Sequence, residues 1–143
     1  MQFSRSSRQD LKNDAVIEML KAGAVAANAP WDYREMVLPM MAAGNVIIAS
    51  KDGVPFGFVF YLKTEMPFTK RTALIEQLLF VLPKHRGSTK NVAGGLLHML
   101  ERVAREEGAQ DIFAGSSLNN NEEAKRVYNR CGFKTTYAFK KEL

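Results

Sequence analysis

One basic, glycine-containing segment carries residues of the kind that bind a phosphate: VLPKHRGSTKNVAGGLLHMLE, residues 81–101. An apolar run ends at Pro83, a loop with arginine, lysine and hydroxyl side chains follows, and a helical apolar pattern then begins. A strand, a glycine loop and a helix start in this order commonly bind phosphate through backbone N–H groups and the helix dipole. The loop is long and has little glycine at its centre, so the pattern predicts a phosphate site with altered geometry.

Apolar periodicity and turn residues place this loop in a mixed α/β order of elements. Apolar residues recur at helical spacing from Val92 to Val103, and Gly108 ends that helix. The Asp52–Gly53 turn between two β-branched and aromatic runs predicts a hairpin. The other expected elements are an edge strand at 1–6, helices at about 11–27 and 32–43, strands at 72–82 and 111–116, a helix at about 121–130, and one or two strands over 133–143. In the first helix the expected N-cap is Asp10 and the expected apolar side is Leu11, Ala15, Ile17, Met19, Leu20 and Val25.

The composition indicates a soluble globular protein with one domain, residues 1–143. Hydrophobic residues make up 46% and charged residues 24%, which is ordinary globular usage. The N-terminus has no apolar signal segment, and the apolar runs are far too short to cross a bilayer. The single cysteine, Cys131, cannot form an internal disulfide. We therefore expect a cytoplasmic protein without membrane contact and, because metal-ligand spacing is absent, without a metal.

The charge balance favours an anionic partner without identifying it. The net charge is 20 − 15 = +5, which suits a nucleotide cofactor, nucleic acid or an acidic protein, or serves solubility alone. The basic residues are not interleaved with aromatics, as they are in single-strand binders, nor are they gathered on one helix face. Nucleic acid is therefore the less expected partner.

Two segments resemble the GNAT superfamily of acyl-CoA-dependent N-acyltransferases. LLFVLPKHRG running into NVAGGLLHMLERVAREEGAQDI resembles the family's strand, its Arg/Gln-x-x-Gly-x-Gly/Ala pyrophosphate loop and the next helix. The resemblance covers residues 72–143 by motif and the preceding residues by element order alone. NNNEEAKRVYNRCGF matches the family's Asn-x-x-Ala-x-x-φ-Tyr-x-x-x-Gly-Phe helix at Asn121, Ala124, Val127, Tyr128, Gly132 and Phe133.

The resemblance implies the GNAT fold, an α/β (α+β) architecture. It has a central mixed, mostly antiparallel sheet of six to seven strands flanked by about four helices. A V-shaped splay is expected between the strands at 72–82 and 111–116, with acetyl-CoA bound in it as cosubstrate. The amine acceptor then attacks the thioester directly in a ternary complex. A homodimer is expected by family habit.

Tyr128 and Glu76 are the catalytic residues that the resemblance implies. A phenol with a pKa near 10 can protonate a departing thiolate with a pKa near 8.5 at a cost of only about 2 kcal/mol, so Tyr128 suits the general acid. A tyrosine that holds its helix against the sheet is the structural alternative. Glu76 is the only acid in TALIEQLLFVL and alternates with Leu78 and Phe80. It suits the general base, unless it faces solvent or a bulge breaks the alternation.

The acetyl-CoA loop departs from the family pattern. It has two extra residues before Leu96, and Asn91 and Ala93 stand where glycines are expected. Asparagine tolerates the left-handed conformation and also serves as an N-cap, so either use fits Asn91. The expected acetyl-CoA contacts are Leu79, Phe80, Val81, Arg86, Gly87, Ser88, Thr89, Lys90, Asn91, Val92, Ala93, Gly94, Asn121 and Ala124.

The acceptor cannot be identified from these residues. Trp31 and Tyr33 are expected to contact it, and residues 63–71 to shape its side of the cleft. Protein amines, polyamines and antibiotics all remain open as acceptors. The alternative function is a GNAT-fold binding module, catalytically weak or inactive, that acts on a protein or nucleic-acid partner. A nucleic-acid binder would lose affinity steeply as salt is added.

Overall fold

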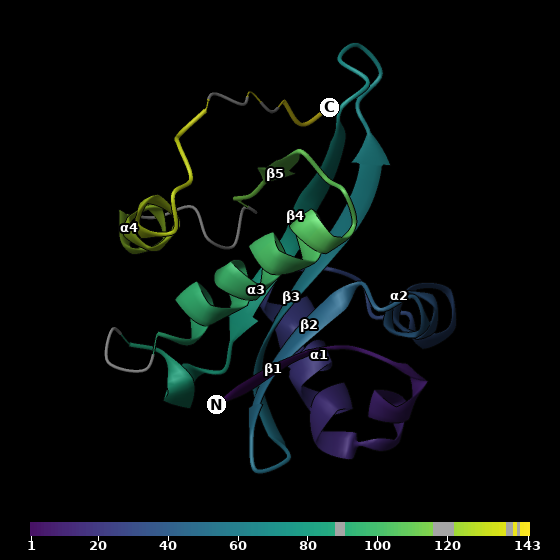
Figure 1. Cartoon of the computed structure of the whole chain (residues 1–143). Helices are drawn as coiled ribbons and strands as arrows, with labels where there is room; N and C mark the ends of the chain where they lie inside the picture. Colours follow the sequence, from purple (N-terminus) through teal and green to yellow (C-terminus); the bar gives the residue numbers. More distant parts are fainter. Residues whose placement is uncertain (88–90, 116–121, 137–138, 140) are drawn as a thin grey trace.

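The fold is a five-stranded sheet with helices on both faces (Figure 1). The computed structural model describes residues 1–87, 91–115, 122–136, 139 and 141–143. The strands lie in the order β1-β2-β3-β4-β5, antiparallel except for the parallel pair β4–β5. The strands are β1 Gln2–Arg5, β2 Val46–Lys51, β3 Val54–Glu65, β4 Thr72–Val81 and β5 Asp111–Phe113. The helices are α1 Asp14–Ala26, α2 Leu38–Ala42, α3 Val92–Glu106 and α4 Glu122–Arg130, with 3₁₀ turns at Arg8–Lys12 and Pro83–His85 and a π turn at Tyr33–Val37.

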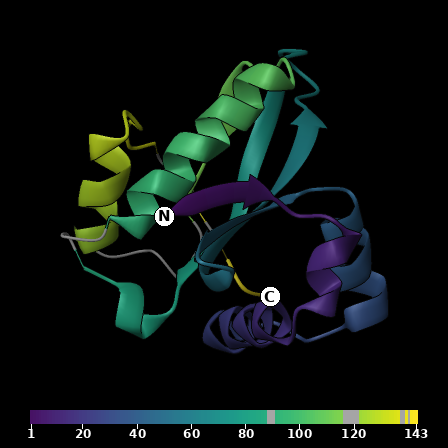
Figure 2. The same cartoon turned by 60° about the horizontal axis from the view of Figure 1, so that its bottom comes forward.

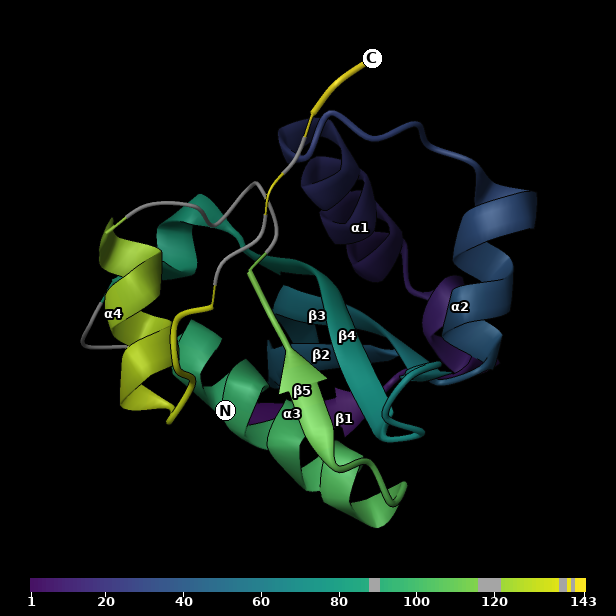
Figure 3. The same cartoon turned by 90° about the horizontal axis from the view of Figure 1, so that it is seen from above.

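Each face of the sheet has its own hydrophobic core. The helices α1 and α2 lie on one side of the strands, and α3 and α4 lie on the other (Figure 3). Figure 2 shows the same division from another direction, with the purple β1 strand leading toward α1. The core on the α3 side includes Leu74, Leu96 and Leu100. The core on the α1–α2 side includes Met19, Met41 and Phe58.

The first helix begins at Asp14 and not at residue 11. Asp10 lies in the preceding 3₁₀ turn, where it completes a capping box with Ser7. Asn13 is the N-cap and accepts a hydrogen bond from the backbone N–H of Ala15. The apolar pattern did not distinguish these two caps, and the buried side also differs from the predicted one. Val16, Met19, Leu20, Gly23 and Ala24 are buried, whereas Ala15 and Val25 are exposed.

The predicted second helix and hairpin are confirmed. The second helix spans the π turn and α2, and it ends before Gly44, whose φ of +73° is the left-handed conformation expected after a helix. Asp52 and Gly53 have φ values of +51° and +77°. This is the turn that matches the twist of a two-stranded hairpin.

The described part of the chain has fewer strands than the sequence predicts. The described part of the chain has five strands, where six to seven are expected. β5 ends at Phe113 and not at residue 116: Ala114 and Gly115 are outside any strand, and residue 116 lies outside the described residues. In the last segment, residues 133–136, 139 and 141–143 form no strand, and residues 137, 138 and 140 lie outside the described residues. Alternation alone does not make a strand, because the strand also needs a partner for its backbone groups.

β4 and β5 are clasped where both strands begin. Arg71 binds Asp111 through two hydrogen bonds, of 2.7 Å from Nε and 2.9 Å from Nη2. The Gln110 backbone N–H donates to the Thr72 carbonyl, and the Gln110 side-chain oxygen accepts from the Thr72 backbone N–H. The ladder between the two strands ends at Ile75–Phe113, while β4 continues to Val81. The two strands therefore pair only at this end, which agrees with the predicted splay.

The Arg71–Asp111 ion pair, called the clasp, leads us to expect that the fold loses stability in acid. The Arg71 guanidinium, which donates to the carboxylate, lowers the pKa of Asp111 below its ordinary 3.8. The pKa of Asp111 is therefore lower in the folded chain than in the unfolded chain. The Arg71–Asp111 pair stabilises the fold at pH values above the ordinary pKa, and this stabilisation is lost as the pH falls through the folded-state pKa. An Asp111→Asn variant should melt below the wild type at pH 7 and converge with it in strong acid. An equal difference in melting temperature at both pH values would contradict this role. Glu106→Gln on α3 is the control.

Candidate active site

A bulge in β4 decides which way Glu76 faces. Two consecutive residues of β3 pair with Leu78 and Glu76, so Gln77 is an extra residue. After the bulge, Leu78 and Phe80 pack against the core on the α1–α2 side, whereas Glu76 reaches Tyr128 of α4. The prediction that Glu76 shares a face with Leu78 and Phe80 is therefore wrong, because the inserted residue breaks the two-residue alternation.

Glu76 is a buried carboxylate that joins three segments of the chain. Its side chain accepts a hydrogen bond of 3.1 Å from the Tyr128 hydroxyl and one of 3.0 Å from the Gly115 backbone N–H. Glu76 is only 5% exposed, and an ionised carboxylate can accept from both donors at once. The Tyr128 ring meets Phe133 edge-on at 5.6 Å, which helps to orient it. The fold thus brings together the two predicted catalytic side chains from β4 and α4.

A cleft of about 280 Å³ opens between the second half of β4, the following loop, the start of α3 and the α4 helix. Glu76 and Tyr128 do not line it, but residues near them in the chain do: Leu79 lies three residues after Glu76 on β4, and Val127 directly precedes Tyr128. Most of the predicted acetyl-CoA contacts line this cleft. They are Leu79, Phe80, Val81, Arg86, Gly87, Asn91, Val92, Ala93 and Ala124, joined by His85, Glu123, Val127 and Arg130.

The remaining predicted contacts fall elsewhere. Gly94 lines a second cavity, on the outer side of α3 and α4. Ser88, Thr89, Lys90 and Asn121 lie outside the described residues.

Asn91, directly before α3, has the backbone conformation that the sequence suggests. Asn91 adopts the left-handed conformation, with φ 46° and ψ 41°. It occupies the N-cap position, but its side chain makes no capping hydrogen bond, so of its two predicted uses only the first is confirmed. The positive end of the α3 dipole therefore opens into the cleft without an Asn91 cap. An anion is the ligand that such a helix end favours.

Two basic side chains border the same cleft. The Arg86 Nε donates to the Val81 carbonyl at 2.7 Å, and its guanidinium lies 5.5 Å from the centre of the Phe80 ring. His85 stacks on Phe56 with ring centres 4.6 Å apart. These contacts hold both side chains at the end of β4, where their charge or hydrogen bonds can reach a bound ligand.

Sequence reasoning missed several lining residues. Glu123, Ala124 and Arg130 lie three or four positions from Val127 on α4, and helical spacing from Val127 would have found Glu123 and Arg130. Gly115 carried no signal, because its role depends on where the chain runs after β5. His85 likewise carried no local signal, because its stacking partner Phe56 lies on β3.

The predicted acceptor contacts, Trp31 and Tyr33, belong to the segment that joins α1 to α2. Trp31 packs against the core on the α1–α2 side, with the Lys21 ammonium 5.7 Å from its ring centre. Tyr33 begins the π turn and is 41% exposed. Neither lines the cleft or the second cavity.

The described part of the chain offers neither a membrane-spanning helix nor a metal cluster. None of its helices has both the length and the apolar composition needed to span a bilayer. Within the same residues, no three His, Cys, Asp or Glu side chains are grouped so that they could hold a metal ion.

Comparison with known proteins identifies the family. The model of the acetyltransferase (GNAT) family matches residues 13–133. The chain therefore belongs to the acetyltransferase (GNAT) family, as its motifs suggested. A search of curated proteins found no match.

Solved structures of N-acetyltransferases share the fold. A ribosomal-protein-alanine N-acetyltransferase from Brucella melitensis biovar Abortus 2308 superposes with a TM-score of 0.77 at 17% identity, covering 100% of this chain and 99% of that one. An aminoglycoside N-acetyltransferase in complex with CoA has a TM-score of 0.76 at 18% identity, covering 99% and 93%. The glucosamine-6-phosphate N-acetyltransferase from Arabidopsis thaliana has 0.75 at 12%, covering 99% and 97%. At these identities the likeness establishes the fold alone.

Proposed function

We propose that the protein transfers the acetyl group of acetyl-CoA to a primary amine, by direct attack of the amine in a ternary complex. The observation that carries this proposal is the hydrogen bond between the Tyr128 hydroxyl and the buried Glu76 carboxylate beside a cleft that suits an anionic ligand. A tyrosine that only packed its helix against the sheet would not require a buried carboxylate as its hydrogen-bond partner. Family membership supports acetyl transfer as the class of reaction.

The cleft has the chemistry that acetyl-CoA requires. Leu79, Phe80 and Val81 at its base belong to the part of β4 beyond its ladder with β5, where an extended pantetheine arm would lie. Its other end has the α3 helix start and Arg86, which suit a pyrophosphate. Acetyl-CoA supplies the acetyl group as a thioester, and its departing sulfur needs a proton.

Glu76 and Tyr128 move the protons in this proposal. The amine loses a proton to the Glu76 carboxylate, directly or through water. Tyr128 gives its phenol proton to the departing sulfur, and protonated Glu76 returns a proton to the Tyr128 oxygen across their 3.1 Å hydrogen bond. Of the two protons that an ammonium acceptor loses, one thus reaches the sulfur and the other leaves to water as the amide forms, and both residues regain their starting state. The Gly115 N–H holds the second Glu76 oxygen during these steps.

The acceptor belongs on the α1–α2 side of the splay in this proposal. Tyr33 is partly exposed and Trp31 is held by its packing, so both can form a wall for an amine-bearing molecule. Aminoglycosides and glucosamine 6-phosphate are named as substrates of similar structures, and they define a first panel of small amines to test.

Acetyl-CoA should raise the melting temperature. A ligand at 100 times its dissociation constant adds about 2.7 kcal/mol to the free energy of unfolding, which is several degrees for a domain of this size. ATP at the same concentration is the control for a general anion effect and should add much less. An equal shift with ATP, or no shift with millimolar acetyl-CoA, would refute donor binding and favour a binding module.

A further inference from the structure

Gln77 is the only exposed residue of β4, whose other residues are buried or half-buried. It is the extra residue of the bulge, between Glu76 and Leu78. It also lies beyond the β4–β5 ladder, which ends at Ile75, so none of the described residues pairs with it from that side. Its side-chain amide has no hydrogen-bond partner among the described residues. A polar side chain left free in the middle of an inner strand is available to orient a ligand.

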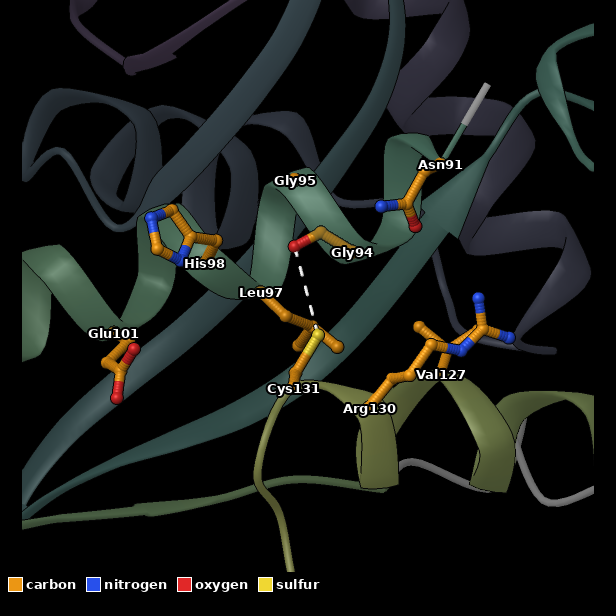
Figure 4. A pocket seen from close by; sticks show the side chains of 9 residues that line it. All are labelled: Asn91, Gly94, Gly95, Leu97, His98, Glu101, Val127, Arg130 and Cys131. Carbon is orange, nitrogen blue, oxygen red and sulfur yellow. Dashed lines mark hydrogen bonds between the residues drawn. The ribbon is translucent and has the colours of Figure 1, made fainter. Parts of the chain in front are cut away.

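The exposed amide of Gln77 belongs to the α1–α2 side of the sheet. Successive side chains of a strand point to opposite faces, and Glu76 points to the α3–α4 side, where it meets Tyr128. Gln77 lines neither the cleft nor the second cavity, which Figure 4 shows between α3 and α4. The next residue, Leu78, packs on the α1–α2 side, where a Cβ atom built on Gly23 of α1 would lie 3.5 Å from its Cδ2 atom. Gln77 therefore faces the side on which the acceptor is proposed to bind.

Three apolar side chains form a row across the same face, next to the bulge. Leu62 of β3 pairs with Ile75 of β4, and Ile75 pairs with Phe113 of β5; directly paired residues share a face of the sheet. Their neighbours Leu74 and Ile112 pack against the core on the α3 side, so the row lies on the opposite face. Leu62 is 44% exposed and Phe113 is 43% exposed, and none of the three packs into either core of the described residues.

The row is continuous with the candidate active site, because Ile75 directly precedes Glu76 in β4. We propose that Gln77 determines acceptor specificity: its amide bonds a carboxamide next to the reacting amine, and an apolar group of the acceptor covers Ile75 and Phe113. A glutamine amide donates and accepts at once, and a carboxamide can meet both bonds.

The acceptor class is therefore an α-amino amide with an apolar side chain. Neither Gln77 nor the apolar row carries a charge, so a second ammonium or a phosphate on the acceptor would gain nothing there. This inference rests on the proposed function, which places the acceptor on the α1–α2 side of the splay.

The test measures kcat and KM of the full chain for leucinamide, glycinamide and 3-methylbutylamine at saturating acetyl-CoA. Glycinamide lacks the apolar side chain of leucinamide, and 3-methylbutylamine lacks its carboxamide. Because the three amines differ in pKa, each variant is compared with the wild type on the same amine at one pH.

Gln77→Met keeps the length of the side chain and removes its amide. It should raise KM for leucinamide and glycinamide about three- to tenfold. The KM for 3-methylbutylamine and the dissociation constant of acetyl-CoA should not change. Gln2→Met is the matched control, because Gln2 is an exposed strand glutamine on β1, at the opposite edge of the sheet from β5. It should match the wild type on all three amines.

A second variant, Phe113→Ala, tests the apolar row. It should raise KM for leucinamide and 3-methylbutylamine about three- to tenfold and leave that for glycinamide unchanged. Phe68→Ala is its control, because Phe68 is fully exposed between β3 and β4 and is not part of the row. Equal changes for all three amines, no effect of Gln77→Met, or turnover of other primary amines but of none of these three would overturn the inference and leave the proposed function intact. Failure of every primary amine would overturn both.

Discussion

Replacing Tyr128 with phenylalanine is expected to lower kcat by about a hundredfold or more, while the dissociation constant of acetyl-CoA stays close to the wild-type value. The variant loses the proton donor for the sulfur, and general acid catalysis typically contributes about 10²–10⁴ in rate. The ring and its edge contact with Phe133 remain, so the helix should stay in place. The measurement is CoA release from acetyl-CoA over a panel of primary amines, alongside calorimetric binding of acetyl-CoA.

The variant also leaves Glu76 with one donor fewer in a buried place. That loss should cost about 1–3 kcal/mol of stability, and a melt must show that the variant is folded at the assay temperature. Tyr61→Phe is the matched control, because the Tyr61 hydroxyl is buried and donates to the Gly44 carbonyl, and Tyr61 does not line the cleft. It should lower the melting temperature and leave kcat unchanged. Wild-type turnover by Tyr128→Phe would remove Tyr128 from the mechanism.

Glu76→Gln is expected to be the other large effect, and it should depend on pH. At neutral pH the rate should fall by about a hundredfold, because the amine keeps its proton and the variant has no base to accept it. The kcat/KM of the variant should rise about tenfold per pH unit up to the pKa of the amine, about 10.4 for a lysine-like acceptor. At higher pH the neutral amine forms without an enzyme base. The measurement is the pH dependence of kcat/KM for wild type and variant.

The pH profile separates a base from a residue that only positions Tyr128. A purely positioning residue would leave a deficit that is the same at every pH, and that result would contradict the proposed proton path. Glu106→Gln is the control, since Glu106 is an exposed glutamate at the end of α3. Its pH profile should match the wild type.

Much of the fold follows from local sequence patterns. The Asp52–Gly53 hairpin, the α3 helix with its glycine end and the Tyr128 helix were predicted correctly, because turn residues, apolar spacing and caps act over a few residues. The left-handed Asn91 was also predicted, since few residue types tolerate that conformation. Elements that need a distant partner were predicted less well: the end of β5 and the final segment depend on whether another strand is present to pair with them.

The residue types of the candidate site were determined by the sequence alone: a tyrosine in a family motif, a single acid in a strand and a basic loop before a helix. Their arrangement was decided by the tertiary structure. The Gln77 bulge turns Glu76 away from the side that its alternation predicted and toward Tyr128. The Arg71–Asp111 clasp holds β4 and β5 together where both begin, and their ladder ends before the cleft. A bulge and a strand ladder depend on residues far apart in the chain, so local periodicity does not specify them.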